Sequence, residues 1–249
     1  MGFSKLDRKR VYLRVSGSIG NFKDKLHKAF DLPEWGFFES AGHLTIFAGL
    51  YHWKDYLRYI FHIGRKKVVW AGSDILNLTP FWAGVLRNVG KHYCENYVEK
   101  EKLESLGIKA EILPCLVGDF DCEISFKPSK KPKVFMTYHV GREKEYGVVD
   151  NSQVYAFSGL SEQNFNNLIP GFQGCYRPNN FDGFSENIYK SILMGQYPLS
   201  YIYYPFTISL KDGLDKALKE LLKRKEPNYV GRDFYLKLIK ESREKLKYE

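Results

Sequence analysis

Residues 175–200 read CYRPNNFDGFSENIYKSILMGQYPLS, and this stretch decides how the rest of the chain is interpreted. An apolar segment, a polar turn containing Gly183, a helical period and a second apolar segment after Gly195 follow one another, which predicts strand, loop, helix and strand. A loop that opens a helix presents unpaired backbone N–H groups together with the positive end of the helix dipole. The stretch therefore predicts a site for an anion, such as a phosphate, at the start of the helix.

This loop and helix resemble the donor-binding segment of GT-B glycosyltransferases, in which an acid, a glycine, an apolar residue and a small residue precede a helix that ends in glycine. The four matching positions are Asp182, Gly183, Phe184 and Ser185. In that family the acid reaches sugar hydroxyls, and the backbone amides that follow hold the donor diphosphate. The resemblance thus implies a catalytic role for Asp182. The donor-binding residues that it implies are Arg177, Gly183, Phe184, Ser185 and Glu186.

One position departs from the family pattern. GT-B enzymes carry a Glu eight positions after the first acid to bind the ribose, whereas this chain has Lys190 there, with Ser191 where Ala is usual. A lysine cannot accept the two ribose hydroxyls as a carboxylate does, although it can meet a phosphate. Ribose recognition therefore stays open, and an ordinary surface turn that opens a core helix is the alternative for the whole stretch.

The length and composition suit folded domains. At 249 residues, with 44% hydrophobic and 16% aromatic residues, the chain can form one large domain or two small ones. No window reaches the ~18 uninterrupted apolar residues of a membrane span, and residues 1–10 lack an apolar signal region. The four cysteines have no CxxC spacing, which indicates neither a zinc site nor a disulfide framework. We therefore expect a cytoplasmic protein.

The net charge of +9 permits attraction to phosphorylated substrates, anionic lipid headgroups or nucleic acid. Most basic residues are flanked by acids, as in residues 211–247, which is typical of a solvated helix face. The 18 Tyr and 18 Phe follow core periodicity and form no RNP-type aromatic box, which disfavours a nucleic-acid binder. Peripheral contact with an anionic membrane is left open.

The first half repeats the alternation of strand and helix. Residues 11–16 predict a strand that runs into Gly17 and Gly20 before a helix. Glycines let a backbone approach a ligand closely, and GT-B N-terminal domains carry a Gly-rich turn at this place, so the resemblance implies that Gly17 and Gly20 contact a ligand. GSIGN is neither a complete GxGxxG nor a P-loop, and a plain tight turn is the alternative.

Polar residues follow the buried strand predicted over residues 67–71. Ligands of open parallel sheets bind beyond the carboxyl ends of the strands, so Asp74 is the candidate general base for an acceptor hydroxyl. The alternative is that Asp74 caps the next helix. His52 opens the helix predicted over 53–61, where a cap or surface residue is the alternative to a functional imidazole. His92 lies between apolar neighbours as a core histidine does, and a position facing the cleft is the alternative.

Residues 118–132, GDFDCEISFKPSKKP, have no clear period and form the best domain boundary. We predict an acceptor domain over 1–118, a linker over 119–133 and a nucleotide-sugar domain with C-terminal helices over 134–249. GT-B proteins supply an Arg and a Lys to the donor phosphates after the first strand of the second domain, and Arg142 and Lys144 stand there.

The fold class predicted is α/β, with two Rossmann-like domains whose parallel sheets face each other across a cleft, as in GT-B proteins. The resemblance implies a metal-independent glycosyltransferase that moves a sugar from a UDP- or GDP-sugar, as substrate rather than cofactor, to a hydroxyl of a glycan, a lipid-linked molecule or a protein. A relative that kept the fold and lost catalysis is the alternative favoured by Lys190. A basic nucleic-acid binder ranks third.

Overall fold

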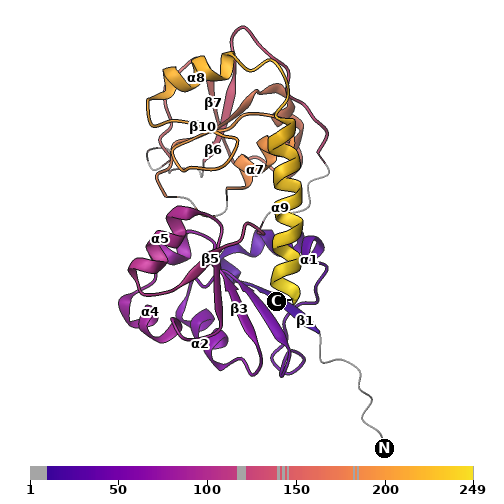
Figure 1. Cartoon of the computed structure of the whole chain (residues 1–249), viewed down its shortest axis with the longest axis vertical. Helices are drawn as coiled ribbons and strands as arrows, with labels where there is room; N and C mark the ends of the chain where they lie inside the picture. The colour runs from indigo at the N-terminus through magenta and orange to yellow at the C-terminus, as the bar shows by residue number, and fades with distance from the viewer. Residues whose placement is uncertain are drawn as a thin grey trace, which may run out of the picture. The chain divides into compact units, whose positions relative to one another are not determined.

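The computed structural model describes residues 10–116, 122–138, 141, 144, 146–181, 183 and 185–248. The chain forms two compact units, one of Met1–Asp119 with Ile239–Glu249 and the other of Phe120–Leu238 (Figure 1). The sequence analysis placed residues 239–249 in the second domain, whereas their contacts place them in the first unit. No helix in the described part of the chain has the length and apolarity to cross a membrane.

The first unit holds a parallel five-stranded sheet in the order β1-β2-β3-β4-β5. Its strands are β1 (Val11–Val15), β2 (Leu44–Ala48), β3 (Lys66–Val69), β4 (Lys91–Cys94) and β5 (Ala110–Ile112). The segments between them form η1 (Gly17–Phe22, a 3₁₀ turn), α1 (Lys23–Phe30), α2 (Trp53–Phe61), α3 (Ser73–Leu76), α4 (Pro80–Leu86) and α5 (Tyr97–Ser105).

Both faces of this sheet are covered. Phe47 on β2 and His92 on β4 face α2, because the ring of Tyr59 lies 5.1 Å from Phe47 and 6.2 Å from His92. Lys67 points to the other face, where its ammonium donates to carbonyls in the last turns of α9 (Tyr229–Tyr248). β2 is buried along its whole length, and Lys67, Val68 and Val69 of β3 are buried as well, as expected for parallel strands whose sheet is covered on both faces.

The second unit holds a parallel five-stranded sheet in the order β10-β9-β8-β6-β7. Its strands are β6 (Val134–Tyr138), β7 (Val154–Ser158), β8 (Gly174–Arg177), β9 (Leu199–Ser200) and β10 (Ile208–Ser209). Its other elements are α6 (Glu162–Leu168), η2 (Ile169–Gly171), α7 (Glu186–Leu193), α8 (Leu214–Leu222) and the first turns of α9.

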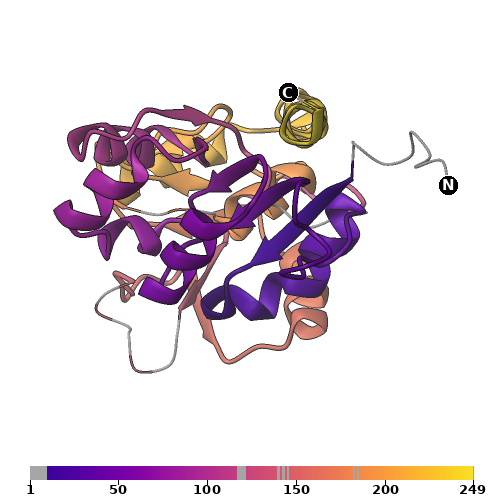
Figure 2. The same ribbon diagram turned by 90° about the horizontal axis from the view of Figure 1, so that it is seen from below.

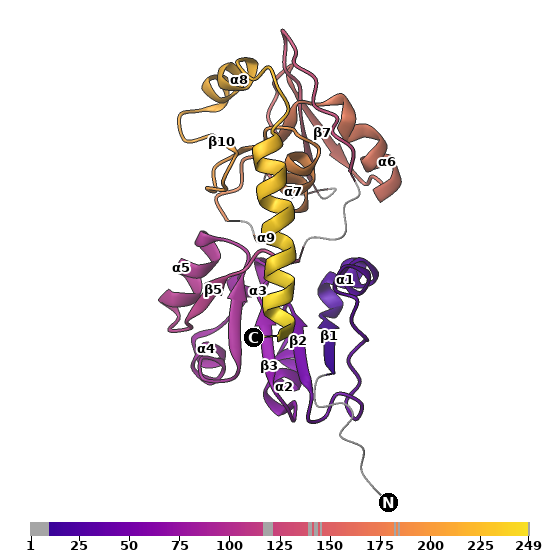
Figure 3. The same ribbon diagram turned by 45° about the vertical axis from the view of Figure 1, so that its right-hand side comes forward.

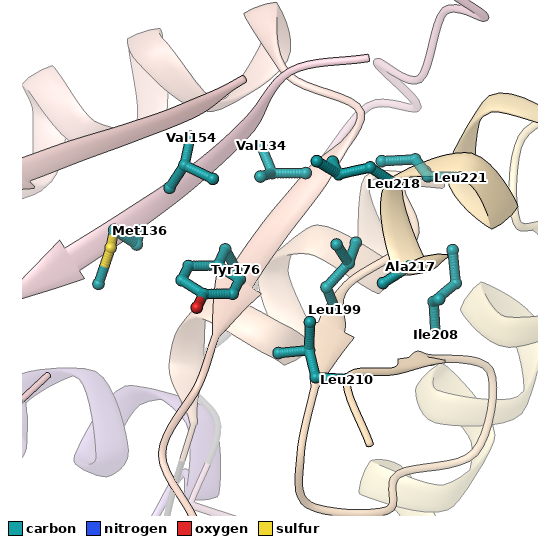
Figure 4. Packing of buried hydrophobic residues seen from close by; sticks show 10 residues of the cluster. All are labelled: Val134, Met136, Val154, Tyr176, Leu199, Ile208, Leu210, Ala217, Leu218 and Leu221. Carbon is teal, nitrogen blue, oxygen red and sulfur yellow. The ribbon is translucent and has the colours of Figure 1, made fainter. Parts of the chain in front are cut away.

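The core of the second unit joins the sheet to α8. Val134 of β6 and Leu199 of β9 lie beside Leu218 and Ala217 of α8, and Tyr176 of β8 belongs to the same buried cluster, as Figure 4 shows. On α7, the apolar residues at helical spacing that the sequence showed are buried, which fixes the helix against the sheet. The prediction of two Rossmann-like α/β domains with parallel sheets is confirmed.

Candidate functional site

The strand order of the second unit reverses at β6. The chain passes from β6 to β7 on one side, then to β8 on the other side of β6, and on to β9 and β10. Connections that leave neighbouring strands in opposite directions open a crevice at the carboxyl ends of those strands, where open α/β sheets bind their ligands. The loops after β6 and β8, which the sequence analysis assigned to the donor, both start at this crevice.

The two loops touch each other. The guanidinium of Arg177, the last residue of β8, lies 5.4 Å from the ring centroid of Tyr146. Gly147 has φ +62° and packs so closely on Pro178 that an added Cβ would lie 3.1 Å from Pro178 Cγ. The loop residues 146–147 and 177–178 are therefore held side by side at the crevice.

Ser185 stands at the start of α7 and is 2% exposed. Its carbonyl accepts the N–H groups of Ile188 and Tyr189, which makes it the N-cap residue, but its side chain makes no capping bond. Among the residues that the structure describes, the buried Ser185 Oγ has no hydrogen-bond partner. A buried hydroxyl without a partner is costly, so Ser185 Oγ is a candidate contact for a bound ligand.

A side-chain bond fixes the first turn of α7 over the end of β6. Asn187 Nδ2 donates to Thr137 Oγ1 at 2.6 Å, and Thr137 is the penultimate residue of β6. The positive end of the α7 dipole is thereby directed to the crevice between β6 and β8. The sequence analysis did not single out Thr137 or Asn187. The only feature of the sequence that indicates them is that each is a polar residue near the end of a predicted element.

The residues assigned to the donor fall into three groups. Arg142, Asp182 and Phe184 lie outside the described residues. Lys144 is exposed on the loop after β6, and Gly183 is buried with its carbonyl 3.5 Å from the hydroxyl of Tyr204. Arg177 and Ser185 are at the crevice, as described above.

Lys190 and Glu186 form an ion pair with each other. Lys190 is 2% exposed, and its ammonium lies 2.9 Å from Glu186 Oε1 and 3.1 Å from Asn166 Oδ1. The ammonium also lies 5.3 Å from the ring centroid of Phe165. The residue that replaces the ribose-binding Glu of the GT-B pattern is therefore a buried cation with partners from α6 and α7.

The glycines after β1 are not required by the fold. Gly17 and Gly20 lie in η1 and are exposed, and a Cβ added to either would meet nothing within 4 Å. Neither has a positive φ. Neither space nor backbone conformation demands glycine at these positions, and contact of Gly17 and Gly20 with a ligand stays a prediction beside the alternative of a plain turn.

Beside this turn the structure brings together side chains that the sequence did not connect. Ser18 Oγ lies 3.1 Å from His52 Nε2 at the carboxyl ends of β1 and β2. Behind them, the buried carboxylate of Asp55 accepts from Ser16 Oγ at 2.8 Å and from Arg14 at 3.1 Å. Ser18 and His52 are exposed, whereas the Asp55 pairings hold the two loops together.

Asp74 does not have the surroundings of a general base that faces an acceptor. It is 0% exposed, and its oxygens accept the backbone N–H groups of Leu50, Ala71 and Ile75 at 3.0 Å each. Burial raises the pKa of Asp74 to about 7, while these amides act against the shift. The expectation of an acceptor-facing base is corrected: the carboxylate ties the loops after β2 and β3 to the start of α3.

His92 is a core histidine. Its ring stacks on Trp70 with centroids 6.1 Å apart, and Trp70 Nε1 donates to Nδ1 at 3.3 Å. Nε2 then carries the proton and donates to the carbonyl of Leu86 at 3.1 Å. Burial lowers the pKa of His92 to about 4, which keeps the ring neutral.

Sequence comparison finds no matching family model and no significantly similar curated protein. Among solved structures, sucrose-phosphate synthase from Thermosynechococcus elongatus is 9% identical with a TM-score of 0.59, over 95% of this chain and 97% of that chain. TarM is 10% identical with a TM-score of 0.44, over 82% of this chain and 52% of that chain. The pneumococcal O-GlcNAc transferase GtfA, solved with UDP and GlcNAc, is 10% identical with a TM-score of 0.43. The first likeness spans both units and confirms the GT-B fold class.

Proposed function

We propose that this chain is a glycosyltransferase that moves a sugar from a nucleotide sugar, UDP- or GDP-linked, to an acceptor hydroxyl. The proposal places the donor diphosphate at the crevice between β6 and β8 in the second unit. The observation that carries it is the buried Ser185 hydroxyl, which lacks a partner within the described chain at the N-terminus of α7. The GT-B fold and the strand reversal at β6 support the same placement.

The chemistry follows from the charges at the crevice. The acceptor oxygen bonds to the anomeric carbon as the bond from that carbon to the phosphate oxygen breaks, and the departing nucleoside diphosphate takes the electron pair of that bond and gains negative charge. The proton of the acceptor hydroxyl passes to the leaving phosphate oxygen or to solvent. In the proposal this charge meets the first-turn N–H groups of α7, the Ser185 hydroxyl and the cations Arg142, Lys144 and Arg177. Fixed positive dipoles of this kind stabilise a leaving group without a metal ion, and Asp182 would hold the transferring sugar.

Ser185→Ala tests the placement, with Ser161→Ala as a matched control. Both serines are N-cap residues, but the Ser161 side chain accepts the N–H of Asn164 at 3.2 Å, whereas the Ser185 side chain caps nothing. Loss of a working cap costs about 1 kcal/mol of stability, so Ser161→Ala should lower the melting temperature and leave nucleotide affinity unchanged. Ser185→Ala should leave the melting temperature unchanged. It should weaken UDP or GDP binding about tenfold or more, as loss of a hydrogen bond to a charged group does.

Calorimetric titration with UDP and GDP gives the nucleotide affinity of the wild type, Ser185→Ala and Ser161→Ala. Thermal melts give their melting temperatures. Nucleotide affinity that is equal in Ser185→Ala and in the wild type would place the diphosphate elsewhere. Transfer itself is checked by incubating the wild type with donor sugars and measuring release of the nucleoside diphosphate with and without candidate acceptors.

A second candidate is a GT-B-like binding protein without catalysis. Lys190 favours it, because a buried cation that is already paired with Glu186 does not offer the two acceptors that a ribose requires. Nucleotide binding that depends on Ser185, with no release of nucleoside diphosphate from any donor sugar, would support this candidate over the transferase.

A further inference from the structure

The amino ends of the strands in the first unit form an edge rich in cations. All five strands are parallel, so the residues at their starts lie along one edge of the sheet. Exposed basic residues precede or open four of them: Arg10 before β1, Arg65 before β3, Lys91 in β4 and Lys109 before β5. Since β3, β4 and β5 are neighbours about 4.8 Å apart, Arg65, Lys91 and Lys109 follow one another along the edge.

Two adjoining cavities open at this edge. One has a volume of about 270 Å³ and is lined by Arg65, Lys66, Lys67 and Lys91 with Gly64 and Gly90. The other has a volume of about 580 Å³, shares Gly90 and Lys91, and adds Arg87 and Lys109. Its acid, Glu111, pairs with Lys245 from α9. Two further lysines are held by backbone carbonyls, Lys66 by Ile60 and Lys67 by the end of α9, and basic side chains outnumber acidic ones in the lining of both cavities.

Large apolar side chains stand in solvent beside these cations. Phe61 ends α2 and is 67% exposed, and Ile63, in the loop into β3, is 70% exposed. Phe38 is 84% exposed, on a loop that is joined to this one because the N–H of Gly42 donates to the carbonyl of Ile63. We name Phe38, Phe61, Ile63, Arg65, Arg87, Lys91 and Lys109 the amino-edge surface.

We infer that the amino-edge surface docks on a bilayer that contains anionic phospholipids. Cations and apolar side chains at one surface match the two layers of a membrane interface, since headgroup phosphates meet the cations while the apolar groups enter the acyl boundary. The cavities lined by arginine and lysine are open to a headgroup. A nucleic acid would meet the cations but would leave Ile63 in water. The inference does not depend on the proposed donor site, which lies in the other unit.

Vesicle sedimentation tests the inference, with phosphatidylcholine alone and phosphatidylcholine mixed with phosphatidylglycerol. The wild type should bind the mixed vesicles, bind the neutral ones far more weakly, and be released by added salt. Arg65→Glu with Lys91→Glu should lower partitioning into mixed vesicles by about tenfold or more, because each basic residue near an anionic surface contributes about 1 kcal/mol. Phe61→Ser with Ile63→Ser should lower it as well, without altering the salt dependence.

The matched control is Lys211→Glu with Lys219→Glu, an equal change in charge at exposed positions of the second unit. Circular dichroism verifies that each variant is folded, which is expected because every substituted side chain is exposed. Equal binding to neutral and anionic vesicles would overturn the inference, and so would equal losses in the control and the Arg65/Lys91 variant. Binding of duplex DNA but not of vesicles, abolished by the Arg65/Lys91 reversal, would reassign the surface to nucleic acid.

Discussion

At the scale of single residues, Lys190 shows how a departure from a family pattern is accommodated. Its ammonium has a carboxylate from the same helix and an amide from α6, so the buried charge is compensated within the second unit. The spacing of Glu186 and Lys190, four residues apart on a helix, was readable in the sequence. The contribution of Asn166, 24 residues away, was not, because it depends on how α6 packs.

Substitutions at Lys190 should separate the effect of side-chain volume on stability from the effect of side-chain charge. Lys190→Met keeps the volume, and Glu186 is partly exposed, so we expect the free energy of unfolding to change by less than about 1.5 kcal/mol. Lys190→Glu would restore the residue of the GT-B pattern but would set a buried carboxylate beside Glu186, at a cost of about 3 kcal/mol or more. Urea denaturation measures both. Stability of Lys190→Glu equal to that of the wild type would show that the ion pair does not hold this helix.

Buried carboxyls in the first unit should make its stability depend on pH. Burial raises the pKa of both Asp74 and Glu95 to about 7, above the range of an unfolded chain. The folded state then binds more protons between pH 4 and 7, so the free energy of unfolding falls as pH rises, by up to about 1.4 kcal/mol per pH unit for each group. Asp74→Asn removes one of the two buried carboxyls, so the free energy of unfolding of this variant should depend less steeply on pH. Denaturation curves at several pH values check it, and an unchanged slope would contradict the assignment to Asp74.

At the scale of elements, much of the fold was readable from the sequence. The helix predicted over residues 53–61 matches α2, and the strands predicted over 11–16 and 67–71 overlap β1 and β3. Strand β10 was missed, since two residues at a sheet edge leave no period. The strand reversal at β6 and the convergence of three amides on Asp74 arise from long-range pairing, which local patterns do not encode.

Two glycine substitutions should have opposite effects on their helices. Gly195 ends α7 with φ +73°, and an added Cβ would lie 3.0 Å from both Ile124 and Pro227. Gly195→Ala should therefore lower the free energy of unfolding by about 1 kcal/mol or more. Gly84 lies within α4 with nothing near its Cβ position, so Gly84→Ala should raise it by up to about 1 kcal/mol. Thermal melts compare the two, and destabilisation by Gly84→Ala would contradict the assigned helix.

At the scale of the whole molecule, the C-terminal segment completes the unit that the N-terminal half begins. Leu246 is 0% exposed, and the carbonyls of residues 245 and 246 accept from the ammonium of Lys67 on β3. The last turns of α9 are drawn beside the strands of the first unit in Figure 3 and are seen end on in Figure 2. Sequence position alone would assign these residues to the second half. A measurement that reports the stability of each unit separately therefore distinguishes membership in the first unit from membership in the second.

Leu246→Ala should therefore weaken the first unit even though the residue lies near the end of the chain. Truncating a buried leucine costs about 2–5 kcal/mol, and the cavity would form against the face of the sheet that carries Lys67. Leu221→Ala is the matched control, because Leu221 is 2% exposed in the core of the second unit. Hydrogen exchange read by mass spectrometry should show loss of protection in β2 and β3 for Leu246→Ala, and in β6 and β8 for Leu221→Ala. Loss of hydrogen-exchange protection in β6 and β8 for Leu246→Ala would instead assign residues 239–249 to the second unit. It would also contradict the packing of the end of α9 on the face of the sheet that carries Lys67.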